Sequence, residues 1–182
     1  NNSLNVFFAV DKNYLIHFTV TLTSLLENNK DLDLTVYIIH DLDDTNLLNE
    51  TVSFLHAAYK VNINLIRVDN SIFDNFQITL YISKATYFRL LFADILPEYI
   101  QSGLYLDCDT IVTGSLRELA NLDFINEKFN ENDYSILAVR DKNELIEIKR
   151  LKSLDIKTEM YFNAGVMMIN LKQWREQKVS DK

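Results

Sequence analysis

The sequence predicts an α/β protein with a Rossmann-like, mostly parallel central sheet and helices on both faces. Over residues 4–68, short apolar stretches alternate with stretches whose apolar side chains recur at helical spacing. Strands that alternate with helices of this length are typical of parallel sheets with right-handed crossovers. Acidic residues such as Asp11 and Asp107 directly follow predicted strands. Because such sheets bind ligands at the carboxyl ends of their strands, we expect the functional site there.

Three strands and two helices account for the first part of the chain. We expect strands at residues 4–10, 34–40 and 61–68, since each is a short apolar or alternating stretch. The apolar spacing that predicts the helices comes from Phe18, Leu22, Leu25 and Leu26 in the first, which ends at Asn28 and Asn29, and from Leu47, Leu48, Val52 and Leu55 in the second.

The rest of the chain is less regular, and residues 69–81 show no periodicity. Ser83 is placed to cap a helix that runs to Phe92, with Arg89 offset from its packed side. Pro97 ends that region. After the central strand we expect a short helix at 115–120, a strand at 134–139, an exposed charged excursion at 142–159, a break at 163–165 before another strand, and a helix from 171 onward.

Composition and charge limit the class of protein. With 182 residues, 48% hydrophobic side chains and only three Gly and one Pro, residues 1–182 are predicted to form one domain without a linker. A net charge of −8 with scattered Lys and Arg argues against nucleic acid as the main partner. The single cysteine, Cys108, excludes an internal disulfide and fits a reducing compartment. No apolar stretch reaches ~18 residues, so no transmembrane segment is expected, and no signal-peptide pattern is present.

The strongest chemical signal is the stretch LYLDCDTIV, residues 104–112. It carries two carboxylates one residue apart, Asp107 and Asp109, directly after an apolar strand. At the end of a strand both can turn toward one point above the sheet. Carboxylate oxygens suit hard cations such as Mg²⁺, Ca²⁺ or Mn²⁺, which take further ligands from phosphate groups. We therefore expect a metal and diphosphate site here; the alternative is a solvated turn or a helix cap.

Four stretches in one order carry a more specific signal than this pair alone: FFAVDKNY (7–14), ISKATYFRL (82–90), LYLDCDTIV (104–112) and YFNAGVMMINLKQWR (161–175). Together they resemble the family 8 retaining glycosyltransferases of the GT-A fold, which include bacterial lipopolysaccharide galactosyl- and glucosyltransferases. The resemblance spans almost the whole chain. It implies transfer of glucose or galactose from UDP-glucose or UDP-galactose to a glycan, glycolipid or glycoprotein acceptor, and a cytoplasmic location, peripheral to the inner face of the membrane.

The resemblance also implies a role for each matching residue on the nucleotide side. The nucleotide pocket would be formed by Ala9, Val10, Asp11, Asn13 and Tyr14. In this pocket the Tyr14 ring would pack on the uracil, while Asp11 and Asn13 would hydrogen-bond the base or ribose.

On the metal and donor side, the resemblance implies that Asp107 and Asp109 hold Mn²⁺, or Mg²⁺, against the donor diphosphate, with the backbone of Cys108 near the ribose. The residues expected to contact the donor sugar are Arg89, Asp107, Asn163 and Ala164, with Gly165 continuing the same turn. Asp141 is the candidate on the acceptor side.

Each of these residues also has a purely structural interpretation. Tyr14 would then be a core residue, Asn13 a helix N-cap, Arg89 the partner of Asp94 in an exposed ion pair, residues 163–165 a turn, and Cys108 a small buried residue without reactivity. The three histidines, His17, His40 and His56, have no metal-ligand spacing and are assigned to packing or the surface.

The chain departs from the family pattern in its last part. It has no Asp-Gln pair followed by Leu-Asn and no His-x-x-Gly-x-x-Lys-Pro-Trp, which would supply a residue near the anomeric carbon, a third metal ligand and a phosphate-binding lysine. We therefore expect a catalytic domain truncated at its C-terminal end, with the catalytic residue beyond Lys182, weak metal affinity and little transfer activity of its own. The oligomeric state is open.

Two other functions remain as alternatives. LDCDT resembles the Asp-x-Asp-x-Thr motif of haloacid-dehalogenase-like phosphatases, in which the first Asp is the nucleophile. That motif normally lies on an early strand, however, whereas three predicted strands precede it here. The non-enzymatic alternative is a UDP-sugar-binding domain that keeps the pocket without turnover.

Overall fold

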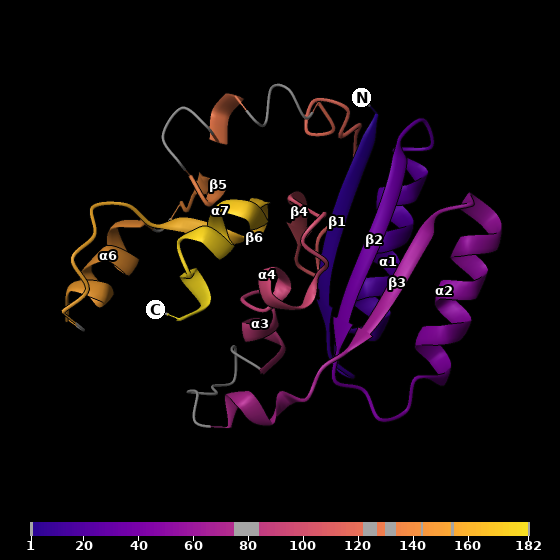
Figure 1. Cartoon of the computed structure of the whole chain (residues 1–182), viewed down its shortest axis with the longest axis horizontal. Helices are drawn as coiled ribbons and strands as arrows, with labels where there is room; N and C mark the ends of the chain where they lie inside the picture. The colour runs from indigo at the N-terminus through magenta and orange to yellow at the C-terminus, as the bar shows by residue number, and fades with distance from the viewer. Residues whose placement is uncertain are drawn as a thin grey trace.

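The computed structural model describes residues 2–74, 84–121, 127–129, 134–142, 144–153 and 155–181. These residues form a six-stranded sheet of order β3-β2-β1-β4-β6-β5 with helices on both faces, as predicted (Figure 1). β1 pairs in parallel with β2 and β4, and β2 pairs in parallel with β3. β6 runs antiparallel to both β4 and β5. The amino end of β6 therefore lies at the same edge of the sheet as the carboxyl ends of β1 and β4.

The elements of the first half match the predicted ones closely. They are β1 (Ser3–Val10), α1 (Leu15–Glu27), β2 (Asp33–His40), α2 (Asn46–Tyr59) and β3 (Asn62–Arg67). A short 3₁₀ helix, Asn70–Phe73, follows β3. The continuous apolar character of β1 is explained by its central position, since helices cover both of its faces.

The second half contains α3 (Lys84–Phe88), α4 (Phe92–Ile95), β4 (Ser102–Leu106), β5 (Ile136–Arg140), α6 (Glu144–Ser153), β6 (Phe162–Asn170), α7 (Leu171–Glu176) and the 3₁₀ helix Val179–Asp181. β5 is an edge strand, and its pairing with β6 is irregular between Ala138 and Arg140.

The sequence was wrong at three places in this half. The helix expected at 83–92 is two short helices, because the amides of Leu90 and Leu91 bond three residues back and break the ladder; Ser83 lies outside the described residues. Where a short helix was expected at 115–120, residues 117–120 form a turn. The exposed charged excursion expected at 142–159 is not contradicted, because α6, which lies in it, is mostly exposed. The expected break at 163–165 lies inside β6, where pairing with the stretch around β4 keeps the backbone extended.

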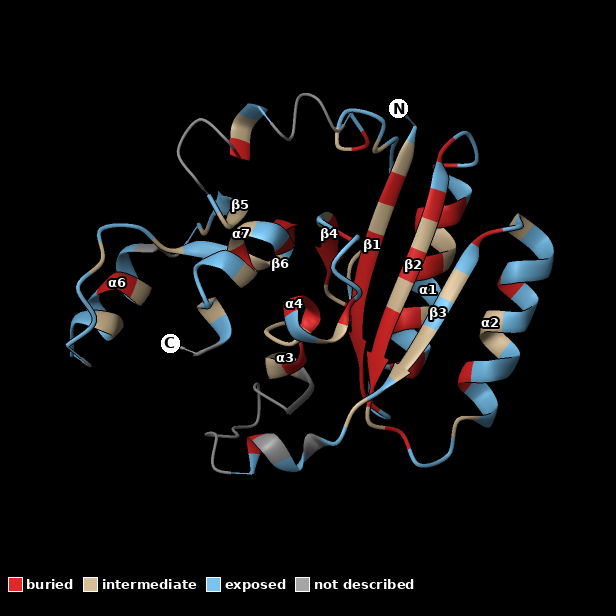
Figure 2. Ribbon diagram, viewed as in Figure 1, coloured by how far each residue is buried: buried red, intermediate tan, exposed pale blue. Residues whose placement is uncertain are grey.

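Two apolar layers hold the helices on the sheet. On one face Phe8 packs against Phe18 of α1, with ring centroids 5.2 Å apart. On the other face Phe7 stacks on Phe92 of α4 at 5.0 Å. Consecutive side chains of a strand point to opposite faces, so β1 contributes to both layers. Figure 2 shows β1, β2 and β4 as the most buried part of the sheet.

Arg175 fastens α7 to the turn that follows α4. Its guanidinium donates to the backbone carbonyl oxygens of Ala93 at 2.7 Å and of Leu96 and Ile100 at 3.0 Å. These carbonyls lie at and beyond the C-terminal end of α4, where no intrahelical partner exists. One side chain therefore satisfies the end of α4 and joins the two helices that cover this face.

Candidate functional site

Asp11 shapes the turn between β1 and α1. Its Oδ1 accepts hydrogen bonds from the backbone amides of Asn13 at 2.8 Å and Tyr14 at 3.1 Å, and the side chain is only 8% exposed. An aspartate that binds amides two and three residues later is a typical turn former. Asp11 is predicted to contact the nucleotide, and the structure adds a second task, that of building the turn around the predicted pocket.

Tyr14 is not a core residue and Asn13 is not a helix N-cap, so neither has the purely structural role considered above. Tyr14 is 42% exposed and lies beside His17, with ring centroids 5.5 Å apart, so it is not a core residue. The residue at the N-cap of α1 is Tyr14, so Asn13 does not cap the helix. Ala9 and Val10 are buried at the end of β1. A half-exposed ring at the carboxyl end of a central strand is available to a planar ligand.

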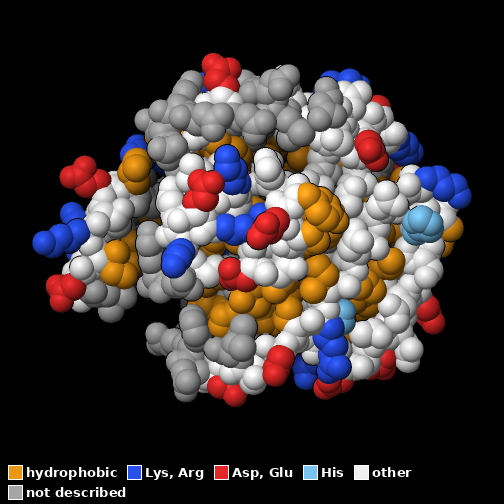
Figure 3. Space-filling model, in the orientation of Figure 1, with side chains coloured by type: hydrophobic (Ala, Val, Ile, Leu, Met, Phe, Trp, Pro, Cys, Tyr) orange, Lys and Arg blue, Asp and Glu red, His pale blue; other side chains and the backbone are white. Residues whose placement is uncertain are grey.

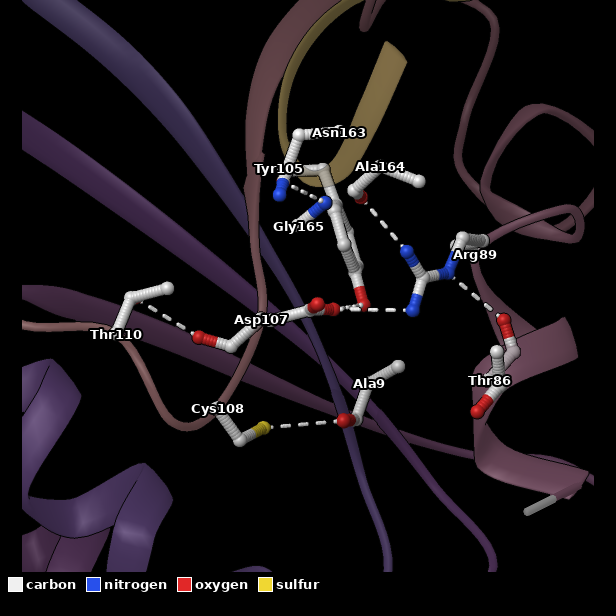
Figure 4. A network of polar contacts seen from close by, with 10 residues as sticks. All are labelled: Ala9, Thr86, Arg89, Tyr105, Asp107, Cys108, Thr110, Asn163, Ala164 and Gly165. Carbon is white, nitrogen blue, oxygen red and sulfur yellow. Dashed lines mark hydrogen bonds and ion pairs between the residues drawn. The ribbon is translucent and has the colours of Figure 1, made fainter. Parts of the chain in front are cut away.

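Asp107, the first residue after β4, lies at the centre of a polar network (Figure 4). Its Oδ1 accepts hydrogen bonds from the Tyr105 hydroxyl at 2.7 Å and from Nη2 of Arg89 at 3.0 Å. Its amide donates to the carbonyl of Gly165 at 2.8 Å. The Asp107 side chain is 34% exposed. The carboxylate is thus held on one side and open to solvent on the other.

Arg89 links three segments of the chain. Its Nε donates to the carbonyl of Thr86 at 2.8 Å, Nη1 to the carbonyl of Ala164 at 2.6 Å, and Nη2 to Asp107. The alternative of an exposed pair with Asp94 is wrong, because the ion pair of Arg89 is with Asp107 and its side chain is only 15% exposed. Arg89 therefore lies at the predicted donor site, and its guanidinium carries more N–H groups than these bonds use.

Cys108 is buried, which agrees with its interpretation as a small core residue. Its thiol donates to the carbonyl of Ala9 at 3.1 Å. Burial raises the pKa of the Cys108 thiol well above its usual value, and the negative charges of Asp107, Asp11 and Asp109 raise it further. The thiol stays protonated and unreactive.

Helix α1 anchors the loop that carries Asp109. The Thr21 hydroxyl lies 2.5 Å from the carbonyl of Cys108 and 2.7 Å from that of Thr110. Ser24 accepts from the amide of Val112, and Asn28 and Asn29 bond the backbone of residues 112–116. The polar residues of α1 and the two asparagines that follow it therefore bond the backbone of the loop, and Asp109 is exposed on an anchored backbone.

The amino end of β6 brings the third segment to this site. Oδ1 of Asn163 accepts from the amide of Gly165 at 2.9 Å, and the carbonyl of Ala164 binds Arg89. A Cβ on Gly165 would lie 2.7 Å from Oδ2 of Asp107, closer than real side chains approach. Glycine at this position therefore lets the backbone of β6 lie close to the Asp107 carboxylate.

Asp141 lies at the carboxyl end of β5, where its amide donates to the carbonyl of Tyr161 at 3.0 Å. β6 separates β5 from β4 in the sheet. The side chain is at the same edge as the other candidates but two strands away from Asp107, and its acceptor role remains a prediction.

The donor set fits a hard cation in part. Oδ2 of Asp107 lies close to Gly165 and accepts no hydrogen bond from the described residues, and Asp109 follows two residues later on an exposed loop. Within the described residues there is no group of three His, Cys, Asp or Glu side chains that could hold a metal ion. Two carboxylates leave most ligand positions to water or phosphate, as Mg²⁺ accepts.

Tyr105 and Thr21 take part in this site but were missed from the sequence. Tyr105 lies two residues before Asp107 in an extended stretch, so both side chains point to the same side. This spacing was a usable signal for Tyr105. The sequence contained no such signal for Thr21, because its hydrogen-bond partners are 87 and 89 residues away.

The face drawn in Figure 3 has Lys and Arg side chains scattered among Asp and Glu. No described helix is both long and apolar enough to cross a membrane.

Comparisons with known proteins agree with this geometry. The family model described as Glycosyl transferase family 8 matches residues 5–182. A lipopolysaccharide 1,2-glucosyltransferase of Escherichia coli is 32% identical over 99% of this chain and 51% of its own length. A lipopolysaccharide 1,3-galactosyltransferase of Salmonella typhimurium is 30% identical over 100% of this chain and 52% of its own length. The chain thus spans about half the length of these curated relatives.

Among solved structures, the galactosyltransferase LgtC in complex with donor and acceptor sugar analogues has a TM-score of 0.79 and 28% identity. It covers 95% of this chain, which corresponds to 60% of LgtC. The GT-A fold expected from the sequence is therefore confirmed, and the matches disfavour the phosphatase alternative.

Proposed function

This chain belongs to glycosyl transferase family 8, and we propose that it binds a UDP-sugar together with Mn²⁺ or Mg²⁺ at the edge formed by β1, β4 and β6. In this proposal the nucleotide lies against Ala9, Val10, Asp11, Asn13, Tyr14 and the backbone of Cys108. Asp107 and Asp109 bind the metal ion, and Arg89, Asn163 and Ala164 contact the donor sugar. The observation that supports it best is the network around Asp107, which joins three segments of the chain at one residue: Arg89 and Tyr105 at its carboxylate and Gly165 at its amide.

The chemistry of sugar transfer explains these residue types. When the bond between sugar and diphosphate breaks, negative charge develops on the departing diphosphate. A divalent cation, when bound, stabilises that leaving group. Arg89 adds a fixed positive charge beside it, already oriented by Thr86 and Ala164, so little reorganisation is needed as charge develops. Retention of the anomeric configuration is inferred from family membership.

We infer that the whole protein is a hexosyltransferase in which this chain supplies the nucleotide and donor side. The described residues offer two carboxylates to the metal ion, and the relatives are about twice as long. We therefore propose that the catalytic residue and a third metal ligand come from a segment outside these residues. The relatives named for lipopolysaccharide transfer favour a glycan or glycolipid acceptor.

Thermal unfolding with and without ligands tests the proposal. UDP with Mn²⁺ is expected to raise the melting temperature by about 5–10 °C, since a ligand at ~100 times its Kd stabilises by about 2.7 kcal/mol. EDTA should abolish the shift, and Asp109→Asn should reduce it. Asp31→Asn, which removes a carboxylate paired with Arg117, is the matched control and should shift like the unmodified chain.

Absence of any UDP-dependent shift with Mn²⁺ would refute the proposal. An equal shift with ADP would argue against selective uracil recognition. Hydrolysis of UDP-glucose or UDP-galactose by the longer protein then identifies the donor, and UDP binding without hydrolysis there would instead support a non-catalytic binding domain.

A further inference from the structure

Tyr105 is a buried tyrosine whose hydroxyl donates a hydrogen bond to one carboxylate oxygen of Asp107. It belongs to β4, is 2% exposed, and donates to Oδ1 of Asp107 at 2.7 Å. Its ring packs near Phe92 in the apolar layer, with centroids 6.1 Å apart. This packing holds the ring, and with it the hydroxyl, in one position. An O–H donated to an ionised carboxylate is stronger than a bond between neutral groups.

Arg89 occupies the same carboxylate oxygen from another direction. Nη2 of Arg89 lies 3.0 Å from Oδ1 of Asp107, and the guanidinium carbon lies 4.8 Å from the centroid of the Tyr105 ring (Figure 4). A carboxylate oxygen has two lone pairs, and these two donors use both. Oδ1 of Asp107 is therefore fully occupied by the protein.

Oδ2 of Asp107 has different surroundings. It lies close to Gly165, accepts no hydrogen bond from the described residues, and belongs to a side chain that is 34% exposed. The carboxylate therefore has one oxygen held by two donors and one oxygen that none of the described residues binds. A cation that binds here meets a single available oxygen.

We propose that the Tyr105 hydroxyl makes Asp107 a one-oxygen ligand and thereby selects Mn²⁺ or Mg²⁺ over Ca²⁺. Mg²⁺ prefers octahedral coordination and takes one oxygen from each of one or two carboxylates, and Mn²⁺ shares the octahedral preference. Ca²⁺ takes 6–8 oxygens and commonly binds both oxygens of a carboxylate. Because Oδ1 is bonded to Tyr105 and Arg89, Ca²⁺ loses a ligand that Mg²⁺ and Mn²⁺ do not need. This inference rests on the proposed metal site.

Tyr105→Phe is the direct test, because it removes the hydroxyl and keeps the ring beside Phe92 and under Arg89. With saturating UDP, Mn²⁺ binding is measured by electron paramagnetic resonance of the free ion, and Ca²⁺ binding by competition. The ratio of the Ca²⁺ to the Mn²⁺ dissociation constant is expected to fall about fivefold in the variant, since one charged hydrogen bond to Oδ1 is lost. Packing changes alone would weaken both ions and leave the ratio unchanged.

Tyr59→Phe is the matched control, because Tyr59 also donates its hydroxyl to a carboxylate, that of Glu27, on the outer surfaces of α2 and α1. It should leave the ratio unchanged. Melting of the metal-free proteins checks that each variant folds. If Tyr105→Phe does not fold, Arg89→Gln removes the other donor to Oδ1 and should lower the ratio in the same direction.

The outcomes separate the inference from the proposed function. An unmodified chain that binds neither ion with UDP overturns both. An unmodified chain that binds Mn²⁺, with an unchanged ratio in a folded Tyr105→Phe protein or in Arg89→Gln, overturns the inference and leaves the proposed function standing.

Discussion

At the scale of single residues, the site depends on how closely the backbone of β6 approaches Asp107. The carbonyl of Gly165 accepts a hydrogen bond from the amide of Asp107, so the two backbone segments are in direct contact. Such contact leaves no room for a side chain between them, and Gly165 supplies none. The glycine is needed here for space, since its φ is not positive.

Gly165→Ala should weaken UDP and Mn²⁺ binding. The new Cβ would lie 2.7 Å from Oδ2 of Asp107, so the carboxylate or the strand has to shift. Overpacking of this kind typically costs ~1–3 kcal/mol, which corresponds to a loss of about fivefold or more in affinity. Titration calorimetry with UDP in Mn²⁺ buffer measures the change.

Gly114→Ala provides the matched control for that substitution. A Cβ on Gly114 would meet nothing within 4 Å, and its φ is not positive. Its affinity should equal that of the unmodified chain. Equal affinities for both alanine variants would mean that the space beside Oδ2 does not matter for binding.

Individual site residues were predictable where the signal is local. Asp107 and Asp109 were found because two acids directly follow an apolar strand. The partner of Arg89 could not be found in this way, since Asp94 is five residues away whereas the true partner, Asp107, is 18 residues away. The roles of the nucleotide and donor residues came from resemblance to the family and remain predictions.

At the scale of elements, α1 connects the predicted nucleotide pocket to the predicted metal loop. The helix begins at the turn formed by Asp11, and its side chain at Thr21 holds the backbone of Cys108 and Thr110. A polar residue is unusual on the buried face of a helix, and Thr21 is 0% exposed. Its hydroxyl satisfies carbonyl groups that would otherwise be buried without a partner.

Thr21→Val should therefore destabilise the protein, although it hardly changes the volume of the side chain. It leaves the carbonyls of Cys108 and Thr110 without their donor, which costs ~1–3 kcal/mol. Urea unfolding measures the loss. Thr23→Val is the control in the same helix, because Thr23 donates only to Thr19 one turn earlier, and it should change stability by less than about 0.5 kcal/mol. Similar losses in both variants would contradict the anchoring role.

The elements themselves were predictable in proportion to their regularity. β1 to β3 with α1 and α2 follow from periodicity alone. The segment at 83–92 did not, since Phe88 and Phe92 satisfy a helical spacing while the backbone between them turns. The packing of both rings in the layer that covers Phe7 decides that shape, and this is tertiary information.

At the scale of the whole molecule, Arg175 joins two helices of the layer formed by α3, α4 and α7. It links α7 to α4 and to the turn after α4. The three carbonyls that it binds at 3.0 Å or less belong to a segment 75 to 82 residues earlier in the chain. The planar guanidinium reaches all three at once, which an ammonium group cannot do.

Arg175→Lys should lower the free energy of unfolding by ~1–3 kcal/mol, because carbonyls at the end of α4 lose their donors. Arg150→Lys is the matched control, since Arg150 forms an exposed pair with Glu147 within α6, worth at most about 0.5 kcal/mol. Urea unfolding of both variants distinguishes the two positions. If Arg175→Lys is as stable as Arg150→Lys, the link between α7 and α4 is not needed for stability.

The position of β6 has a consequence for the order in which the site forms during translation. β6 lies between β4 and β5 in the sheet but leaves the ribosome after both. In the described sheet β5 has no other neighbour, so it waits for β6 before it can pair. The carbonyl of Ala164 that holds Arg89 arrives with the same strand. A nascent chain can therefore complete β1 to β3 early, whereas Arg89, Asp107 and Asp141 reach their final places only once residues 162–170 have emerged.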